Sequence, residues 1–368
     1  MSQLFFWFLL FILPFVINPF GGAFYESPKV IMAEVVVEML MVYFLLRHKI
    51  NIKKAFLYST GLIFLISLAG LIFHPSSIAL FGNQFRLQGT FLVWHLLIFA
   101  LISSQFELKI PKILTLLLLP ILLIATVLLG TESNGRAFAT LGEPNALAAV
   151  AIFFWPFAWF IPVNQLSLGQ KNKWLIKYSS LLLALLIILL SGSRSGFVAL
   201  VTQTLLLLSF HLTKNLKLAL GIGLLLFLAS ILLPFFPKNT GYKFENRAEV
   251  WRVSAVAGLE KPLTGQGFGN IENVLKSTSQ KLNSDLQYQY VDSTHNVFLD
   301  YWVESGLLGF GVLGFLVTSS FKTFLASKKV KEILLILGLL IVLSFNPASV
   351  VILIAFWWLI GQGFRVSD

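Results

Sequence analysis

The fold class is decided by residues 175–211, which read LIKYSSLLLALLIILLSGSRSGFVALVTQTLLLLSFH. Two apolar runs, 175–191 and 196–211, flank a short polar turn. Each run is long enough to cross a hydrocarbon layer about 30 Å thick as an α-helix. The stretch therefore predicts two membrane-spanning helices joined by a tight turn.

Composition extends this interpretation to the whole chain. Of the 368 residues, 57% are hydrophobic and only 12% are charged, and the mean hydropathy is +0.85. Soluble domains carry about 25% charged residues. These values exclude an ordinary soluble enzyme, a disordered chain and a nucleic-acid-binding module. We predict an all-α, polytopic membrane protein.

About twelve transmembrane helices are expected along the chain. The apolar runs are 4–20, 30–46, 55–73, 89–104, 112–129, 145–163, 175–191, 196–211, 218–235, 296–321, 333–345 and 348–363. The glycines of the run 296–321 allow that helix to break or tilt. The predicted organisation is nine helices in 1–235, a large external loop in 236–294 and three helices in 295–368. A connection of this length is usually functional. Within it, 243–260 is expected to form an amphipathic helix with Arg247 and Trp251 on one face, and 271–279 a second short helix.

Basic residues gather in alternate loops, which predicts the orientation of the chain. These residues are Arg47, Lys49, Lys53, Lys54, Lys109, Lys112, Lys171, Lys173, Lys177, Lys214, Lys217, Lys322, Lys328, Lys329 and Lys331. Cytoplasmic loops carry an excess of Lys and Arg. We therefore expect both termini in the cytoplasm and the large loop outside. The same rule explains most of the formal net charge of +11.

The sequence argues against metal and nucleotide chemistry. It contains no cysteine, and its five histidines are scattered, so Cys-ligated metals are excluded and a zinc site is not expected. The glycine run 265–269 lacks the preceding strand and the spacing of a nucleotide-binding loop.

Two arginines lie at external helix ends. Arg194 stands in the small, polar turn 191–196, and Arg136 lies shortly before Pro144 and Asn145 at the start of the sixth run. Free N–H groups at a helix N-terminus favour anions. An arginine at a membrane edge can also extend to the lipid headgroups. Anion binding and simple anchoring are both open at this point.

The densest polar cluster opens the tenth run. His295, Asn296, Asp300 and Glu304 fall within its first turns, where a polar group without a partner is costly. A lone histidine at such a place is usually interfacial, but this grouping favours a functional site.

Two glutamates in the second run leave a different function open. Glu34 and Glu38 lie one helical turn apart, and they could line a cavity, pair with an arginine or carry protons. A transporter or flippase of lipid-linked or small solutes is therefore the alternative. The absence of an internal repeat counts against it.

Four ordered pieces of the sequence resemble the O-antigen ligase and polymerase superfamily. They are Arg136 with residues 142–148, then Gly192-Ser193-Arg194-Ser195, then Arg247-Ala248-Glu249-Val250-Trp251 with Pro262 and residues 265–267, and finally 295–299 through 304–309. Together they cover about residues 136–309, and the N-terminal third agrees only in topology. Glu143 stands where Asn or His is frequent in the family.

The resemblance implies a membrane glycosyltransferase of polysaccharide or lipopolysaccharide biosynthesis. It would work on the outer side of the bacterial cytoplasmic (inner) membrane, among membrane lipids, without a metal or another cofactor. Its donor would be an undecaprenyl-diphosphate-linked glycan. Its acceptor would be a lipid, as for a ligase, or a second glycan, as for a polymerase.

This chemistry suits particular side chains. Arginine stays charged and binds phosphate through two donors, and imidazole titrates near working pH. The expected catalytic residues are His295, Arg247 and Arg194. The expected substrate-binding residues are Arg136, Asn145, Trp251, Asn296 and Glu304.

Overall fold

The computed structural model describes residues 2–18, 20, 25–47, 51–132, 135–161, 170–213, 215, 218, 221, 223–225, 228 and 247–366. Over these ranges the chain is all-helical, as predicted, apart from one isolated β-bridge between Thr131 and Ala137. The predicted ninth run, 218–235, and the start of the external loop lie largely outside the described residues.

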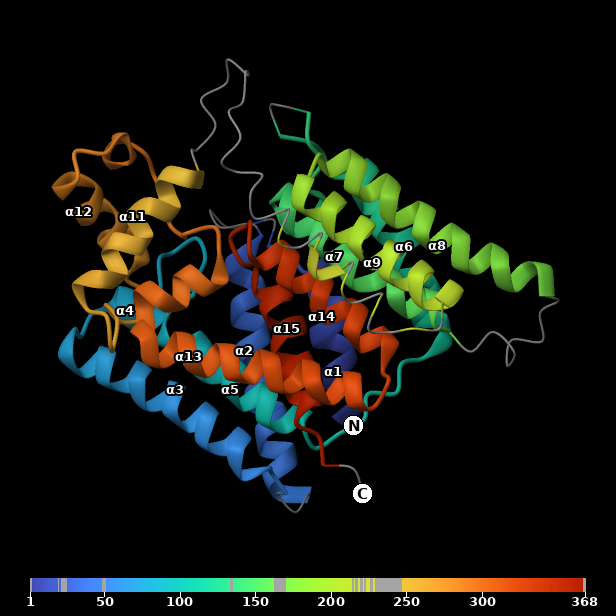
Figure 1. The fold of residues 1–368 in the computed structure, drawn as a ribbon, viewed down its shortest axis with the longest axis horizontal. Helices are drawn as coiled ribbons and strands as arrows, with labels where there is room; N and C mark the ends of the chain where they lie inside the picture. Colours follow the sequence, from blue (N-terminus) through green and yellow to red (C-terminus); the bar gives the residue numbers. More distant parts are fainter. Residues whose placement is uncertain are drawn as a thin grey trace.

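The helices follow the predicted apolar runs (Figure 1). In chain order they are α1 (Ser2–Trp7, extended by Phe8–Ile12 and Leu13–Phe15), α2 (Glu26–Arg47), α3 (Lys54–Phe73), α4 (Ser77–Phe81), α5 (Thr90–Ser103), α6 (Lys112–Leu128), α7 (Pro144–Trp159), α8 (Gln170–Ser191), α9 (Arg194–Thr213), α11 (Arg247–Glu260), α12 (Ile271–Lys281), α13 (Val297–Ala326), α14 (Val330–Leu343) and α15 (Val350–Gly363). The two short helices expected in the external loop are α11 and α12.

Length and composition qualify four of these helices to cross a membrane. They are α3, the part of α8 from Trp174, α9 and α13. The apolar helices α1, α5, α6, α7 and α15 are shorter. A multi-pass membrane protein is therefore supported, and about twelve crossings remain a prediction.

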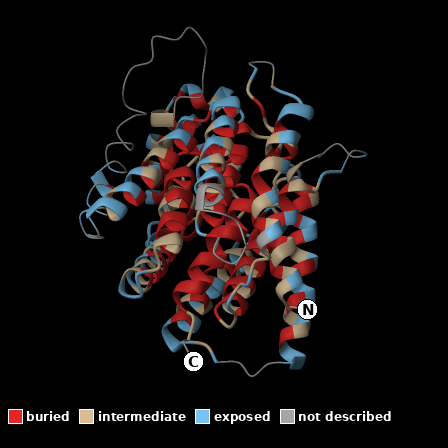
Figure 2. Cartoon of the chain, turned by 90° about the vertical axis from the view of Figure 1, so that its right-hand side faces the viewer, coloured by how far each residue is buried: buried red, intermediate tan, exposed pale blue. Residues whose placement is uncertain are grey.

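The centre of the bundle is formed by α7 and α15. Every residue of α15 is buried, and so is every residue of α7 except Asn145 and Trp159. Figure 2 shows buried residues along the middle of the bundle and exposed ones on its outer surface. That outer surface is itself apolar on α3, where Leu65 and Ile72 are exposed. An apolar surface of this kind suits contact with lipid.

Both ends of the chain meet one loop. The amide of Gln3 donates to the carbonyl of Glu107 at 2.8 Å, and Arg365 pairs with the carboxylate of Glu107 at 3.2 Å. The start of α1 and the end of α15 therefore lie at the same end of the bundle.

The external loop has a small core of its own. Val250, Val253 and Ala257 of α11 pack with Ile271 and Leu275 of α12 and with neighbouring apolar side chains. Val303 of α13 belongs to the same cluster. Figure 1 shows α11 and α12 side by side next to the first part of α13. The loop is thus a folded unit that rests on a membrane helix.

The α13 helix breaks at Gly306, where φ is +61°. In an unbroken helix Leu307 N would donate to Val303 O, and Leu308 N to Glu304 O. Here the segment 262–267 supplies all four partners. Gln266 N donates to Val303 O at 2.8 Å and Gly267 N to Glu304 O at 2.9 Å.

The two freed donors of α13 are satisfied by the same segment. Leu307 N donates to Pro262 O at 2.7 Å, and Leu308 N donates to Leu263 O at 3.2 Å. Unpaired backbone groups near hydrocarbon cost several kcal/mol each. The break and the glycine-rich loop therefore depend on each other, and together they fix the loop on the membrane domain.

Replacing Gly265 should destabilise the protein strongly. A Cβ at Gly265 would lie 2.3 Å from the carbonyl carbon of Glu304, and its φ of +70° is unfavourable for any side chain. We expect Gly265→Ala to lower the free energy of unfolding by about 2 kcal/mol or more. Thermal unfolding of the purified protein in detergent measures this.

Gly311→Ala is the matched control, because Gly311 lies in α13, which the loop contacts, and nothing lies within 4 Å of its added Cβ. Equal melting temperatures for the two variants would show that the loop does not hold the broken helix.

Candidate functional site

The turn between α8 and α9 gathers polar groups from distant segments. Gly192 has a φ of +60°, which allows the chain to reverse between the two helices. Arg194 is the first residue of α9, and its side chain is exposed. The turn thus presents one guanidinium at a helix N-terminus, as the sequence predicts.

Arg136 is held against this turn. Its Nε donates to Ser191 O at 2.9 Å, and its Nη2 donates to Asn145 Oδ1 at 3.1 Å. Asn145 in turn donates to Glu143 Oε1 at 3.4 Å. Two of the expected binding residues, Arg136 and Asn145, therefore contact each other and meet the turn that carries Arg194.

A buried lysine anchors the Arg136 segment to the bundle. Lys29 of α2 is fully buried, and its Nζ donates to Thr140 O and to Tyr25 O, both at 2.7 Å. Gly142 permits this packing, because a Cβ there would lie 2.5 Å from the Tyr25 ring. The segment before α7 is therefore firmly positioned.

Arg247 reaches the same turn through one asparagine. Its Nη2 donates to Asn346 Oδ1 at 3.4 Å. Asn346 is buried, and its Nδ2 donates to Ser195 Oγ at 2.6 Å. Trp251, one turn further along α11, packs on Phe345 with ring centroids 5.9 Å apart. Helix α11 is thus attached to the end of α14. It lies beside the turn 191–196 between α8 and α9, which we call the arginine turn.

Sequence reasoning missed Asn346. It lies between two strongly apolar helices, in the short connection of α14 to α15. A buried polar residue at such a place is a signal in itself, because it needs hydrogen-bond partners.

The residues that open α13 have mixed roles. Asn296 caps the helix, because its Oδ1 accepts from Phe298 N at 2.9 Å and Leu299 N at 3.3 Å. His295 has a φ of +57°, and its N–H donates to Ser293 Oγ at 3.1 Å. Glu304 is buried and accepts from Gly269 N at 2.8 Å. Asn296 therefore has a structural task besides any contact with substrate.

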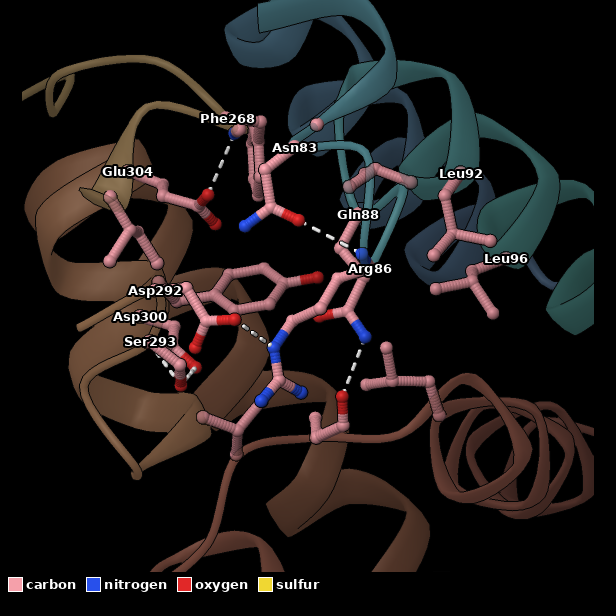
Figure 3. A pocket seen from close by; sticks show the side chains of 18 of the residues that line it. Asn83, Arg86, Gln88, Leu92, Leu96, Phe268, Asp292, Ser293, Asp300 and Glu304 are labelled. Atoms are coloured by element: carbon pink, nitrogen blue, oxygen red, sulfur yellow. Dashed lines mark hydrogen bonds and ion pairs between the residues drawn. The ribbon is translucent and has the colours of Figure 1, made fainter. Parts of the chain in front are cut away.

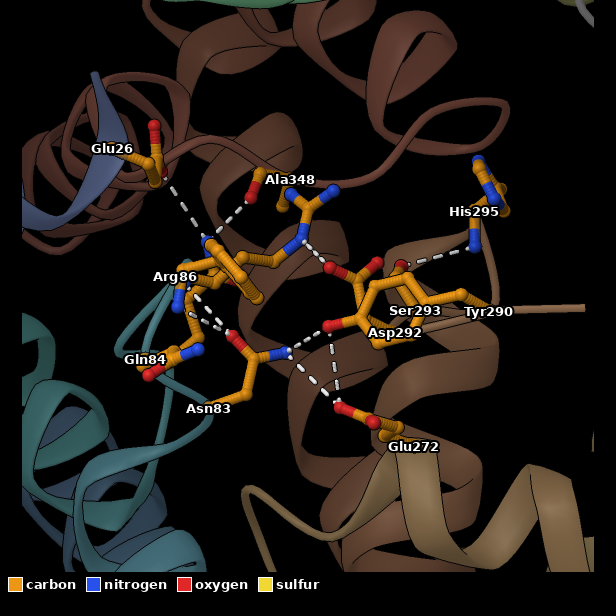
Figure 4. Close-up of polar contacts among 12 residues, drawn as sticks. Glu26, Asn83, Gln84, Arg86, Glu272, Tyr290, Asp292, Ser293, His295 and Ala348 are labelled. Atoms are coloured by element: carbon orange, nitrogen blue, oxygen red, sulfur yellow. Dashed lines mark hydrogen bonds and ion pairs between the residues drawn. The ribbon is translucent and has the colours of Figure 1, made fainter. Parts of the chain in front are cut away.

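Arg86 is a second residue that the sequence did not reveal. It lies in the connection of α4 to α5, and its Nε donates to Asp292 Oδ2 at 2.6 Å. Figure 4 shows this pair close to Ser293, with Asp292 on the side that faces His295. Although burial opposes its charge, Asp292 and Glu143 raise the pKa of Arg86 further. Arg86 stays a cation.

Glu143 lies between the two groups of charges. Burial raises the pKa of Glu143, while Arg86, His295 and the hydrogen bond from Asn145 act in the opposite direction. Glu143 is thus coupled to Arg136 through Asn145 and to Arg86 and His295 through charge. The arginine turn and the start of α13 border one region.

Glu26 connects the start of α2 to this region. Its carboxylate accepts from Ser349 Oγ at 3.0 Å, just before α15, and from Gln88 Nε2 at 3.5 Å. Gln88 also donates to Ala348 O at 2.6 Å. Figure 4 shows Glu26, Ala348 and Arg86 grouped beside Asp292. Three segments far apart in sequence are therefore tied together at the site.

Glu34 and Glu38 of α2 take no part in this arrangement. Glu38 Oε1 lies 3.2 Å from His95 Nε2, and the Glu38 side chain is 54% exposed. His95 Nδ1 lies 2.8 Å from Phe91 O. Glu34 and Glu38 do not line the cavity that lies between α5 and α13.

In the part of the chain that the structure describes, no three His, Asp or Glu side chains are grouped as metal ligands. No metal or other cofactor was expected from the sequence.

Residues 179–314 match the family model described as O-Antigen ligase. This segment of the chain is therefore similar to the O-antigen ligase family. The matched segment contains the arginine turn, α11, the glycine-rich loop and the break in α13. A comparison with curated proteins gave no significant match.

The raised pKa of Glu143 predicts a pH-dependent stability. A carboxyl whose pKa is higher in the folded state binds an extra proton there, so its contribution to stability falls as pH rises above the unfolded value of about 4.3. Glu143→Gln removes this loss. We expect the melting temperature of the variant, relative to wild type, to rise between pH 5 and pH 8.

Thermal unfolding in detergent at both pH values measures the difference. A constant difference between the two proteins would contradict the raised pKa of Glu143.

Proposed function

We propose that this chain transfers a glycan from a polyprenyl diphosphate to an acceptor hydroxyl on the outer side of the bacterial cytoplasmic membrane. The family supports a glycosyltransferase of the ligase or polymerase type. The observation that carries the proposal is the convergence of Arg136, Arg194 and Arg247 on one turn. A diphosphate leaving group requires such a concentration of positive charge.

The reaction needs positioning and charge stabilisation, because the donor is already activated. The acceptor oxygen forms a bond to the anomeric carbon as the bond from that carbon to the diphosphate oxygen breaks. The diphosphate leaves with the electron pair, and the arginines neutralise its charge. His295 takes the proton of the acceptor hydroxyl.

The neighbours of the arginines would set their geometry. Asn145 and the Ser191 carbonyl orient Arg136, while Asn346 orients Arg247. Trp251 fixes α11 by packing on Phe345. Guanidinium groups that are held in advance lose little freedom when they bind phosphate. Asn296 and Glu304 hold the start of α13, which carries His295 at its edge.

The location of Glu34 and Glu38 favours transfer over transport. A transporter would use them inside a midplane cavity. Instead Glu38 pairs with His95 and is half-exposed on the flank of α2. A ligase and a polymerase would share the site and differ in the acceptor that enters it.

The alternating basic loops and the shared location of both chain ends support cytoplasmic termini. Reporter tags at Lys53, Lys171 and Lys329 should then face the cytoplasm, and a tag at Ser279 should face outside. Accessibility of the tags to a membrane-impermeant reagent in intact cells measures this. External labelling at Lys171 would contradict the predicted orientation, and the proposed site would then not face the outer side.

Arg247 should be essential for donor binding. We expect Arg247→Ala to lower the transfer rate by about 10²–10³, the usual effect of losing a donor to developing charge. Arg247→Lys should also be impaired, because lysine lacks the planar fork. Arg252→Ala is the control, since Arg252 is exposed on the same helix and pairs with Glu249. If Arg247→Ala transfers glycan at the wild-type rate, Arg247 serves only to anchor its helix.

His295→Gln should slow turnover more than it weakens donor binding. Glutamine still forms hydrogen bonds, but it cannot accept the proton of the acceptor hydroxyl. Donor affinity and single-turnover rate, measured separately, test this. A normal single-turnover rate would require a different base.

A further inference from the structure

A cavity lies beside the arginine turn, between the connection of α4 to α5 and the start of α13. It encloses about 740 Å³ of space that no atom fills, including its open mouth. Figure 3 shows Asn83, Arg86 and Gln88 on one side and Asp292, Asp300 and Glu304 on the other.

The lining of the cavity combines polar and apolar side chains. Leu92 and Leu96 of α5, with Leu353 and Trp357 of α15, are among the apolar ones. Phe268, from the glycine-rich loop, is also part of the lining. A ligand with one apolar face and several polar edges would match these walls.

Three carboxylates of the lining are fixed through one oxygen each. Asp292 Oδ2 holds Arg86, Glu304 Oε1 holds Gly269 N, and Glu272 Oε2 accepts from Tyr290. Among the described residues, the second oxygen of each carboxylate has no hydrogen-bond partner. An ionised carboxylate, such as that of Asp292 beside Arg86, only accepts hydrogen bonds, so this wall of the cavity favours a ligand that donates.

Tyr301 provides an independent observation. Tyr301 is only 7% exposed, and it lines the cavity. Its ring packs on Phe268 with centroids 5.5 Å apart, whereas its hydroxyl has no hydrogen-bond partner in the described part of the chain. A phenolic hydroxyl can donate and accept a hydrogen bond. Because Tyr301 lines the cavity, its hydroxyl is available to a ligand there.

The chemistry of the walls favours a neutral ligand rich in hydroxyl groups. The carboxylates would repel a diphosphate, and Arg86 already supplies the cation that Asp292 needs. A sugar ring presents hydroxyls that both donate and accept, together with an apolar face of C–H groups. That combination fits the polar and aromatic side chains of the lining.

We propose that this cavity binds the sugar ring of the acceptor, whose hydroxyl is to be glycosylated. This deepens the proposed function and rests on it for the acceptor role. In this proposal the donor diphosphate binds at the arginine turn. Ser293 joins His295 to the cavity, because it accepts from His295 N at 3.1 Å and is part of the lining.

The direct test is binding of a panel of neutral methyl pyranosides, measured by saturation-transfer NMR on the full-length protein in lipid nanodiscs. We expect wild type to transfer saturation from its aromatic protons to the sugars. Tyr301→Phe, which removes only the hydroxyl, should weaken binding about three- to tenfold. Glu272→Gln should weaken it as well.

Tyr288→Phe is the matched control, because Tyr288 is 83% exposed and does not line this cavity. It should bind as wild type does. Inorganic diphosphate should not displace the sugars.

Three results would overturn the proposal: no binding of any pyranoside, unchanged binding by Tyr301→Phe, or displacement by diphosphate. The binding measurement does not depend on glycan transfer. A negative result would therefore not contradict the proposed donor site at the arginine turn. Loss of donor binding in Arg247→Ala would likewise be independent of it. In the transfer reaction, Tyr301→Phe should raise the KM for the acceptor and leave that for the donor unchanged.

Discussion

The exchange of backbone hydrogen bonds at Gly306 is the constraint on which the segment from α11 to the start of α13 depends. Two helical bonds of α13 are replaced by four bonds to the segment 262–267. These bonds fix the glycine-rich loop, and the loop connects α11 to α12. Arg247 is at one end of this unit and His295 follows its other end. The position of both residues therefore follows from one break in a membrane helix.

A second consequence is the separation of charge across the external surface. Arginines gather at the turn between α8 and α9, whereas carboxylates line the neighbouring cavity, with Glu143 between them. A single reaction can use both halves, because a diphosphate and a sugar hydroxyl make opposite electrostatic demands.

Much of the fold could be predicted from hydropathy, because apolar runs long enough for helices leave little freedom. The contact of Arg136 with Asn145 and with the turn before Arg194 follows from their places at adjacent helix ends. Arg86 and Asn346 could not be predicted in the same way. Each is a single polar residue without a periodic pattern, and its partner lies about 100 residues or more away. The glycines signalled turns, but not the exchange of bonds with α13.

The central claim is that the chain forms glycosidic bonds with a polyprenyl diphosphate donor. The most direct measurement uses purified protein in proteoliposomes with a polyprenyl-diphosphate-linked oligosaccharide and a lipid or glycan acceptor. We predict that one polyprenyl diphosphate is released for each glycan joined to the acceptor. Movement of the intact lipid-linked glycan across the bilayer, with no diphosphate released, would contradict the account.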